Sequence, residues 1–399
     1  MLSQFKFAQD FDFKGQTCLM RVDFNVPLQD GVITDDTRIQ RVLPSIRRLQ
    51  SQGAKIILLS HLGRPKGQYV ASLSLRPIAQ YVSELLKQDV AFLDDITAQE
   101  AQGRCEALAN GDIMMTENLR FWPGEEANDA QFAAMLSSLG DLFIQDAFSA
   151  SHRAHASTEG ITKHMPSYVG DQMAAELKAL SDVLVAPQRP VVAVVGGAKV
   201  STKLAVLENL VKQTDMLILG GGMANSFLGA QGMDMKASLS EPDLFETARQ
   251  IMTIAEEAGC EIIIPTDGLA AYEFAENASH RAILNEEIAD GEMMLDVGPQ
   301  SIQNAIAAIE KAKTVLWNGP MGAFEIKPFD NATVAVAKAV AHQTQKGAVV
   351  SVAGGGDTVA ALNVAGVAGE FSYLSLAGGA FLEWLEGKTL PGVAALQTK

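Results

Sequence analysis

Short apolar runs alternate along this chain with longer stretches whose apolar residues recur at helical spacing. The apolar runs are predicted strands, and they cover residues 17–22, 54–60, 112–116, 142–145, 191–195, 216–219, 262–265, 314–317, 348–352 and 373–376. The predicted helices cover residues 39–52, 75–86, 129–139, 199–211, 242–258, 301–312, 331–343 and 380–386. Because the strands are apolar on both faces, this pattern predicts parallel sheets that helices cover on each side.

The length of 399 residues exceeds that of one typical hydrophobic core, so we expect more than one domain. Residues 171–186 form an amphipathic segment, which Pro187 and Pro190 end directly before a predicted strand. We interpret this segment as a connecting helix and hinge between two α/β domains. Each domain is expected to be Rossmann-like and three-layered, a parallel sheet flanked by helices. An ordinary crossover helix within one larger sheet is the alternative.

The formal net charge of −16 argues against nucleic acid and membrane surfaces as partners, since both are anionic. No apolar run approaches the about 20 residues of a membrane span, and the N-terminal segment lacks the apolar stretch of a signal peptide. Cys18, Cys105 and Cys260 show no metal-binding spacing, which suits a reducing, cytoplasmic location. An acidic chain that binds phosphates must concentrate positive charge locally.

Polar and cationic side chains follow the predicted strands of the N-terminal half. Parallel strands point the same way, so groups that follow them converge at one sheet edge, where such folds bind ligands. Guanidinium groups donate paired hydrogen bonds to phosphate and carboxylate groups. The candidate anion-binding residues are Asp23, Asn25, Arg38, His61, Arg64, Arg120 and Arg153. A solvated surface position or an ion pair explains any one of these arginines taken alone, but their repetition at strand ends favours a site.

Glycine turns follow the predicted strands of the C-terminal half. Gly196 and Gly197 lead into a segment with Lys199 and Lys203, which are four residues apart and therefore expected on one helix face. A strand, a glycine turn and a helix N-terminus together suit phosphate, although the spacing is not that of a P-loop. Close packing of helix on strand is the alternative explanation for any single glycine turn.

The turn at residues 354–358 adds a carboxylate and a hydroxyl where a helix is expected to begin. Asp357 is a candidate ligand of Mg²⁺ bound to nucleotide phosphates, because Mg²⁺ binds one or two carboxylates together with phosphate oxygens. A helix N-cap is the other interpretation of Asp357. Glu325, behind another glycine turn, is a candidate acceptor of hydrogen bonds from ribose hydroxyls.

Seven motifs in this chain together resemble the phosphoglycerate kinase family. They are RVDFNVP at 21–27, SHLGRP at 60–65, ENLRF at 117–121, DAF with SHRAHAS at 146–157, GGAKVS at 196–201, LWNGPMGAFE at 316–325 and AGGGDT at 353–358. The motifs occur in the family's order. The chain departs from the usual pattern at residues 149–151, and at Leu376 and Ala377, where a Thr-Gly pair is common in the family.

The resemblance implies a glycolytic enzyme that reversibly transfers a phosphoryl group from 1,3-bisphosphoglycerate to ADP, giving 3-phosphoglycerate and ATP with Mg²⁺. It implies that residues 1–170, joined by residues 388–399, bind 3-phosphoglycerate or 1,3-bisphosphoglycerate, and that residues 187–387 bind Mg-ADP or Mg-ATP. The anion-binding residues above would hold the substrate, with Arg38 and Lys199 catalytic. The nucleotide residues would be Lys199, Lys203, Gly221, Asn318, Glu325, Gly355, Gly356, Asp357 and Thr358, with Asp357 at the metal. A monomer that closes by hinge-bending is expected from the family.

Two other functions compete with this prediction. Glycine turns also suit a nicotinamide-dependent oxidoreductase, but no GxGxxG motif follows the first strand of either half. The departures from the family pattern also leave a non-catalytic protein that binds anions or nucleotides. An assay for ATP formation distinguishes all three functions.

Overall fold

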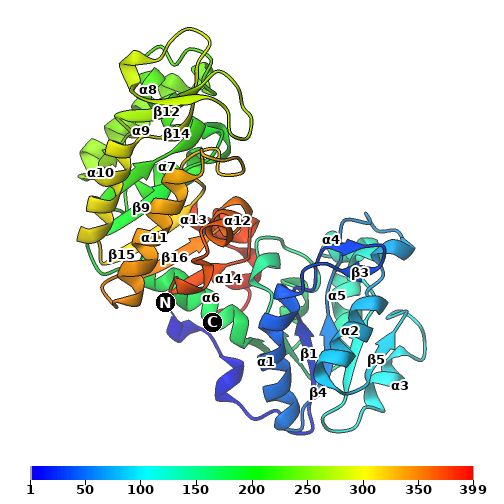
Figure 1. Ribbon diagram of the computed structural model, residues 1–399. Coiled ribbons are helices and arrows are strands. Elements are labelled where there is room, and N and C mark those ends of the chain that lie inside the picture. Colours follow the sequence, from blue (N-terminus) through cyan, green and yellow to red (C-terminus); the bar gives the residue numbers. More distant parts are fainter. Residues whose placement is uncertain (1, 399) are drawn as a thin grey trace. The chain divides into compact units, whose positions relative to one another are not determined.

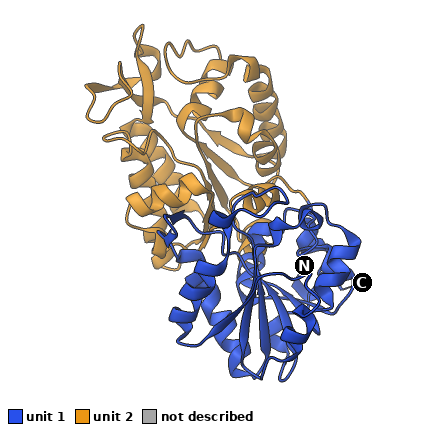
Figure 2. Cartoon of the chain, turned by 90° about the vertical axis from the view of Figure 1, so that its right-hand side faces the viewer, with its two compact units in different colours: residues 1–178, 389–399 blue, residues 179–388 orange. Residues whose placement is uncertain are grey.

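The computed structural model describes residues 2–398, which form two compact units. Unit 1 comprises the chain up to Lys178 together with the segment that starts at Thr389, and unit 2 comprises Ala179–Lys388. Figure 1 shows the elements along the chain, and Figure 2 shows the two units in separate colours. Met1 and Lys399, the outer ends of the expected ranges 1–170 and 388–399, lie outside the described residues.

Unit 1 is built on a six-stranded parallel sheet with the order β5-β6-β4-β1-β7-β8. The strands are β1 (Thr17–Arg21), β4 (Lys55–Leu59), β5 (Val90–Leu93), β6 (Ile113–Thr116), β7 (Leu142–Gln145) and β8 (Ser167–Val169). The helices are α1 (Thr37–Ser51), α2 (Arg76–Leu86), α3 (Ala101–Glu106), α4 (Pro123–Glu126), α5 (Ala130–Ser137) and α14 (Pro391–Ala394). Between β1 and α1, β2 (Leu28–Gln29) and β3 (Val32–Ile33) form a short antiparallel hairpin.

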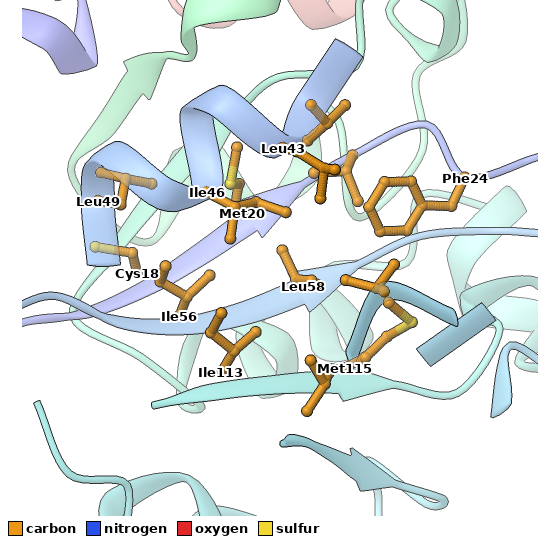
Figure 3. Close-up of a cluster of buried hydrophobic side chains, with 14 of the residues drawn as sticks. Cys18, Met20, Phe24, Leu43, Ile46, Leu49, Ile56, Leu58, Ile113 and Met115 are labelled. Atoms are coloured by element: carbon orange, nitrogen blue, oxygen red, sulfur yellow. The ribbon is translucent and has the colours of Figure 1, made fainter. Parts of the chain in front are cut away.

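Both faces of the unit 1 sheet are buried, because successive residues of a strand point to opposite sides. Met20 of β1 packs in a cluster with Ile46 of α1 and Leu58 of β4 (Figure 3). Its neighbour Leu19 belongs to a second cluster, which includes Phe143 of β7. Burial of each such side chain contributes about 1.5–3 kcal/mol to folding, which explains why the strand is apolar at every position before Arg21 except its first.

Unit 2 is built on a second six-stranded parallel sheet with the order β11-β10-β9-β15-β16-β17. The strands are β9 (Val191–Val195), β10 (Met216–Leu219), β11 (Glu261–Ile263), β15 (Thr314–Asn318), β16 (Val350–Gly354) and β17 (Tyr373–Ser375). The helices are α7 (Leu204–Leu210), α8 (Gly221–Ala230), α9 (Phe245–Ala258), α10 (Pro299–Lys311), α11 (Asn331–Gln345), α12 (Gly356–Val364) and α13 (Gly379–Leu385). Two parallel sheets flanked by helices confirm the predicted fold class.

The segment that links the two units is α6 (Asp171–Leu180), which continues as a π-helical turn over Ser181–Val185. Arg48 of α1 holds its start through a bidentate ion pair with Asp171, at 2.7 and 2.8 Å. None of the helices formed by residues 2–398 is both long and apolar enough to cross a membrane.

Among the elements absent from the predicted ranges is a three-stranded antiparallel sheet of unit 2 with the order β13-β12-β14. Its strands are β12 (Asp267–Ala271), β13 (His280–Leu284) and β14 (Met293–Val297). The strand β12 opens with Asp-Gly, a pair typical of turns, and β13 is exposed at four of its five positions. Neither strand therefore carries the continuous apolar run that revealed the parallel strands.

Candidate functional site

The carboxyl ends of the unit 1 strands carry a cluster of positive charge with His61 in its middle. His61 follows β4 and has only 7% of its surface exposed. Burial lowers the pKa of His61 well below its usual value, and the nearby charges of Arg21, Arg120, His155 and Arg38 lower it further. His61 is therefore neutral at physiological pH, and it marks the point where these cationic side chains converge.

Asp23 anchors Arg38 within this cluster. One carboxylate oxygen of Asp23, Oδ2, accepts a hydrogen bond from Arg38 Nη1 and another from Ser149 Oγ, both at 2.5 Å. Asp23 thereby joins the first turn of α1 to the loop that follows β7. Ser149 lies in the stretch 149–151, so this departure from the family pattern still supplies a hydroxyl to the cluster.

The loop after β4 is held at Gly63 from two sides. The Asn25 side chain accepts a hydrogen bond from Gly63 N at 2.9 Å, and Arg120 Nη1 donates to Gly63 O at 2.8 Å. Burial lowers the pKa of Arg120 to about 10, with further lowering by Arg21 and Arg153, while Glu126 opposes this shift. The predicted residues Asn25 and Arg120 thus shape the site through the backbone of its loop.

Two predicted arginines remain exposed at the surface of the cluster. The Arg64 side chain, next to Gly63, forms no hydrogen bond or ion pair with any residue between 2 and 398. Within residues 2–398, the Arg153 side chain donates to its neighbour His152, from Nε to Nε2 at 3.2 Å. Both guanidinium groups keep most of their donors for a ligand.

Two buried charged residues behind the cluster, Arg21 and Glu125, are not among the predicted site residues. Arg21, the last residue of β1, is fully buried, with Nη2 3.0 Å from His61 Nδ1 and Nε 2.9 Å from Ser157 Oγ. Glu125 is also fully buried and accepts the Ser157 hydroxyl proton at 2.6 Å. One signal was present in the sequence, because Arg21 alternates with Asp23 and period-2 spacing places both side chains on one face.

In unit 2, Lys203 joins two glycine turns. Its ammonium donates to the main-chain carbonyls of Gly196 at 2.8 Å and Asn318 at 3.0 Å. Burial lowers the pKa of Lys203 to about 8, and the charge of Asp357 opposes that shift. Lys203 is thus held at the carboxyl edge of the sheet, within electrostatic range of the α12 N-terminus.

The prediction that Lys199 and Lys203 share one helix face was wrong. Lys199 precedes a 3-10 turn over Val200–Thr202, and α7 begins only after Lys203. The Thr202 hydroxyl donates to Lys199 O at 2.9 Å, which closes this tight turn and breaks the helical spacing. Lys199 is exposed, whereas Lys203 points into the sheet edge.

The glycine turns after β9, β10 and β15 pack directly on one another. Gly221, with φ of +64°, donates to Met321 O at 2.6 Å, and a Cβ at Gly221 would lie 2.8 Å from Gly197 O. A Cβ at Gly196 would lie 1.9 Å from Pro320 O, so no other residue fits there. Close packing of backbone therefore accounts for the glycines at these positions.

The turn after β16 leads directly into the N-terminus of α12. Gly355 is the N-cap of α12 with φ of +99°, and a Cβ there would lie 2.8 Å from Asn318 Nδ2. Asn318 Nδ2 donates to Gly354 O at 2.8 Å, while the buried Asn318 Oδ1 has no hydrogen-bond partner among residues 2–398. Thr358 Oγ1 accepts from Gly319 N at 2.7 Å. Backbone N–H groups at a helix N-terminus suit an anion, and the unpaired Asn318 Oδ1 suits a donor on that ligand.

Asp357 is exposed on the first turn of α12, and Gly355 rather than Asp357 is the helix N-cap. The Asp357 carboxylate forms no hydrogen bond or ion pair with the residues 2–398, so its oxygens are open to a cation. Within the same residues, no group of three or more His, Cys, Asp or Glu side chains is placed to hold a metal. One open carboxylate next to a phosphate-suited turn fits Mg²⁺, which takes most other ligands from phosphate and water.

Glu325 lies between β15 and α11 and is exposed. Its carboxylate has no hydrogen-bond or ion-pair partner in the described part of the chain. Lys199 and Glu325 are therefore placed at the surface, whereas Lys203, Asn318, Thr358 and the glycine turns form a connected edge.

This chain is an α/β enzyme of the phosphotransferase class. One parallel sheet carries a cluster of cationic side chains, and glycine turns that suit an anion line the carboxyl edge of the other sheet. The chain belongs to the phosphoglycerate kinase family, whose sequence model matches residues 8–388. The phosphoglycerate kinase of Sinorhizobium medicae is 55% identical over 394 residues, covering 98% of this chain and 99% of the relative. The phosphoglycerate kinase of Methylobacterium radiotolerans is 54% identical over 399 residues, the full length of both chains.

Solved structures give the same assignment. The phosphoglycerate kinase from Coxiella burnetii superposes with a TM-score of 0.92 at 39% identity, covering 98% of each chain. The phosphoglycerate kinase from Pyrococcus horikoshii superposes with a TM-score of 0.80 at 30% identity, also covering 98% of each chain. The family predicted from the seven motifs is confirmed.

Proposed function

We propose that this chain is the glycolytic enzyme that reversibly transfers a phosphoryl group from 1,3-bisphosphoglycerate to ADP, giving 3-phosphoglycerate and ATP. The observation that carries the proposal is the cationic cluster around His61 in a chain that the family model matches over residues 8–388. A strongly acidic protein has little other reason to gather cations at the carboxyl edge of one sheet, where such folds bind ligands.

The acceptor site is proposed to lie in unit 1. Both phosphoglycerates carry two anionic ends, and paired guanidinium donors recognise each of these groups. Arg64 and Arg153 are exposed with open donors, which supports direct contact with the substrate. Asp23, Asn25, Arg38, His61 and Arg120 complete the proposed substrate set.

The nucleotide site is proposed to lie in unit 2. The α12 N-terminus and Lys203 supply positive charge for the phosphates, and a Cβ at Gly356 would meet nothing within 4 Å, which leaves room for a phosphate oxygen. Glu325 is proposed to accept hydrogen bonds from the ribose hydroxyls. The complete proposed set is Lys199, Lys203, Gly221, Asn318, Glu325, Gly355, Gly356, Asp357 and Thr358.

Mg²⁺ is the proposed cofactor, held by Asp357 together with the nucleotide. Its chemical contribution would be to neutralise charge on the phosphates of ADP or ATP. The proposal is supported by the open carboxylate of Asp357 and by its position on the first turn of α12.

The proposed mechanism relies on positioning and charge rather than on a general base. An acyl phosphate is already activated, and the attacking oxygen of ADP is already ionised at neutral pH. Phosphoryl transfer then needs groups that neutralise charge on the moving phosphoryl, and Arg38 and Lys199 are proposed for this role. The neutral His61 is proposed as a substrate ligand and not as a nucleophile.

A coupled assay tests the proposal directly. Purified protein with 3-phosphoglycerate, ATP and Mg²⁺ should form 1,3-bisphosphoglycerate, which excess glyceraldehyde-3-phosphate dehydrogenase converts with oxidation of NADH. The variant Lys199→Ala, purified in parallel, excludes a contaminating kinase. Folded wild-type protein without activity in either direction would contradict the proposed function.

The remaining proposals concern location and assembly. A cytoplasmic protein is supported by the glycolytic role and by the three cysteines, Cys18, Cys105 and Cys260, which are buried and unbridged. A monomer that binds neither nucleic acid nor membrane is proposed from the family and the net charge of −16. Light scattering after size exclusion gives the oligomeric state.

A further inference from the structure

We propose that Glu125 is a positioning residue for the acceptor site. Through Ser157 it holds Arg21 in place, and Arg21 in turn makes His61 present an Nε2–H donor to the substrate. The proposal rests on the proposed function, in which His61 is a ligand of an anionic phosphoglycerate. It assigns a task to two buried charged residues that the mechanism above does not use.

Glu125 lies on α4 and is held by two hydrogen bonds from one residue. Ser157 N donates to Glu125 Oε2 at 3.0 Å, and Ser157 Oγ donates to Glu125 Oε1 at 2.6 Å. His155 Nδ1 lies 3.6 Å from Glu125 Oε1. Both carboxylate oxygens therefore have defined partners, and the carboxylate sits fully buried behind the cationic cluster.

Arg21 connects this carboxylate to His61. The Ser157 hydroxyl gives its proton to Glu125 and accepts Arg21 Nε at 2.9 Å, while Arg21 Nη1 donates to Val22 O at 2.6 Å. The guanidinium is fully buried, and burial lowers the pKa of Arg21, whereas the charges of Glu125 and Asp23 raise it. A buried cation is tolerated only with a compensating charge nearby, and Glu125 provides one through the Ser157 hydroxyl that bridges it to Arg21.

The geometry at His61 defines its tautomer. Arg21 Nη2 lies 3.0 Å from His61 Nδ1, and a guanidinium group donates hydrogen bonds but cannot accept them. His61 Nδ1 must therefore be the acceptor, so a neutral His61 carries its proton on Nε2. No residue between 2 and 398 accepts a hydrogen bond from that Nε2–H. The donor is left for an oxygen of the substrate, whereas the opposite tautomer would present a lone pair that repels an anion.

The tautomer is observable without turnover. Uniform ¹⁵N-histidine labelling and long-range ¹H–¹⁵N correlation spectra of the whole protein report which nitrogen of each of the 6 histidines carries the proton. The signals of His61 are assigned by their loss in His61→Gln. We expect an unprotonated Nδ1 and a protonated Nε2, and a proton found on Nδ1 would overturn the proposal.

Variants test the role of Glu125. Glu125→Gln replaces one carboxylate oxygen with an NH₂ group, which cannot accept a hydrogen bond from Ser157. We therefore expect both tautomers of His61 to be populated. The KM for 3-phosphoglycerate should rise by about 10- to 100-fold, the effect expected for loss of one charge-assisted hydrogen bond. The fall in kcat should be smaller than the rise in KM, because ground-state and transition-state binding weaken together. Glu84→Gln, on the exposed side of α2, is the matched control.

Folding and activity are kept separate in this design. If Glu125→Gln does not fold by circular dichroism, Ser157→Ala replaces it, since that variant keeps both charges and removes only the bridging hydroxyl. A folded variant with unchanged tautomer and unchanged KM contradicts the role of Glu125. A wild-type protein with the expected tautomer but without kinase activity would contradict the proposed function and not the role of Glu125.

Discussion

Lys203 Nζ donates a hydrogen bond of 3.0 Å to the main-chain carbonyl of Asn318 and so ties the start of α7 to the end of β15. A second bond of 2.8 Å to Gly196 O leaves the ammonium one further donor. The same side chain is therefore a structural clamp and a partly buried cation that interacts electrostatically with Asp357 on the first turn of α12. Its pKa of about 8 makes that cation sensitive to pH.

Nucleotide binding should take up protons near pH 8. The free protein is about half protonated at Lys203 at that pH, and an incoming phosphate favours the charged form, so binding raises the pKa of Lys203 from about 8. Affinity for Mg-ADP should fall as pH rises above 8. Calorimetric titration in buffers of different ionisation enthalpy measures the uptake, which should vanish in Lys203→Met.

Deprotonation of Lys203 makes the folded protein more stable, whereas deprotonation of a lysine in an ion pair makes it less stable. The pKa of Lys203 is about 8 in the folded chain, below its ordinary value of 10.5, so between these values the unfolded chain binds more protons. Burial of the charge therefore destabilises the fold most below pH 8, and this penalty decreases as pH rises towards 10.5. Lys203→Met should show a smaller gain of Tm with pH across that window; an unchanged slope would contradict the assignment.

Removing the proposed catalytic lysine should slow turnover without unfolding the protein. Lys199 is exposed, so its side chain contributes little to packing. If Lys199 neutralises charge in the transition state, Lys199→Ala should lower kcat by on the order of 10²-fold or more. Lys212→Ala, at an exposed position just after α7, is the control. Near-normal kcat in the Lys199 variant would refute the role.

Arg64→Ala should weaken acceptor binding selectively. Arg64 has no hydrogen-bond or ion-pair partner among residues 2–398, so its loss should change the free energy of unfolding by less than about 0.5 kcal/mol. The KM for 3-phosphoglycerate should rise about tenfold or more, with the KM for ATP unchanged. Lys14→Ala, an exposed cation before β1 at the opposite sheet edge, should change neither value.

Asp357→Asn should raise the Mg²⁺ concentration that activity requires. The open carboxylate becomes a neutral amide, so Mg-nucleotide should bind roughly tenfold more weakly or worse, while free ADP should bind no more weakly than before. Titrating Mg²⁺ at fixed ADP, and measuring ADP binding in EDTA, separates the two effects. Equal weakening with and without Mg²⁺ would argue for a role in the turn rather than at the metal.

Asp296 of β14 should make unit 2 less stable as pH rises. Its Oδ2 accepts a hydrogen bond from Ala332 N at 2.9 Å, and its buried Oδ1 has no hydrogen-bond partner in the described part of the chain. Burial raises the pKa of Asp296 to about 8. Between pH 4 and pH 8 the folded chain therefore binds more protons than the unfolded chain, and stability falls across that window.

Asp296→Asn keeps an acceptor for Ala332 and removes the charge. Its Tm should match that of the wild type at about pH 4, and its advantage should grow from there to pH 8, reaching roughly 10 °C or more at pH 9. Scanning fluorimetry across this range checks the trend, with the exposed Asp243→Asn as the control. A difference in Tm that does not change with pH would contradict a buried, proton-linked carboxyl.

Local patterning was enough to predict two parallel sheets flanked by helices and the residues that follow their strands. Strands buried on both faces are apolar throughout, as β9 is, so alternation with helices revealed two parallel sheets. Residues directly after such strands lie at one edge, which is why Asn25, His61 and Arg120 could be named in advance. The antiparallel sheet escaped this reasoning because β13 is largely exposed and carries no such run.

The sequence by itself thus determined which residues reach the sheet edges, since that depends only on spacing along one strand. Tertiary structure alone decided which of them meet. Arg21 contacts Ser157, 136 residues away, because β1 lies between β4 and β7 in the sheet. The order of strands in a sheet cannot be derived from the sequence of any one strand. The turn that separates Lys199 from Lys203 is likewise held in place by Glu241, which lies forty residues away and accepts hydrogen bonds from Ser201 N and Ser201 Oγ. Contacts between residues far apart in the sequence set the orientation and protonation of these side chains, and local periodicity does not predict those contacts.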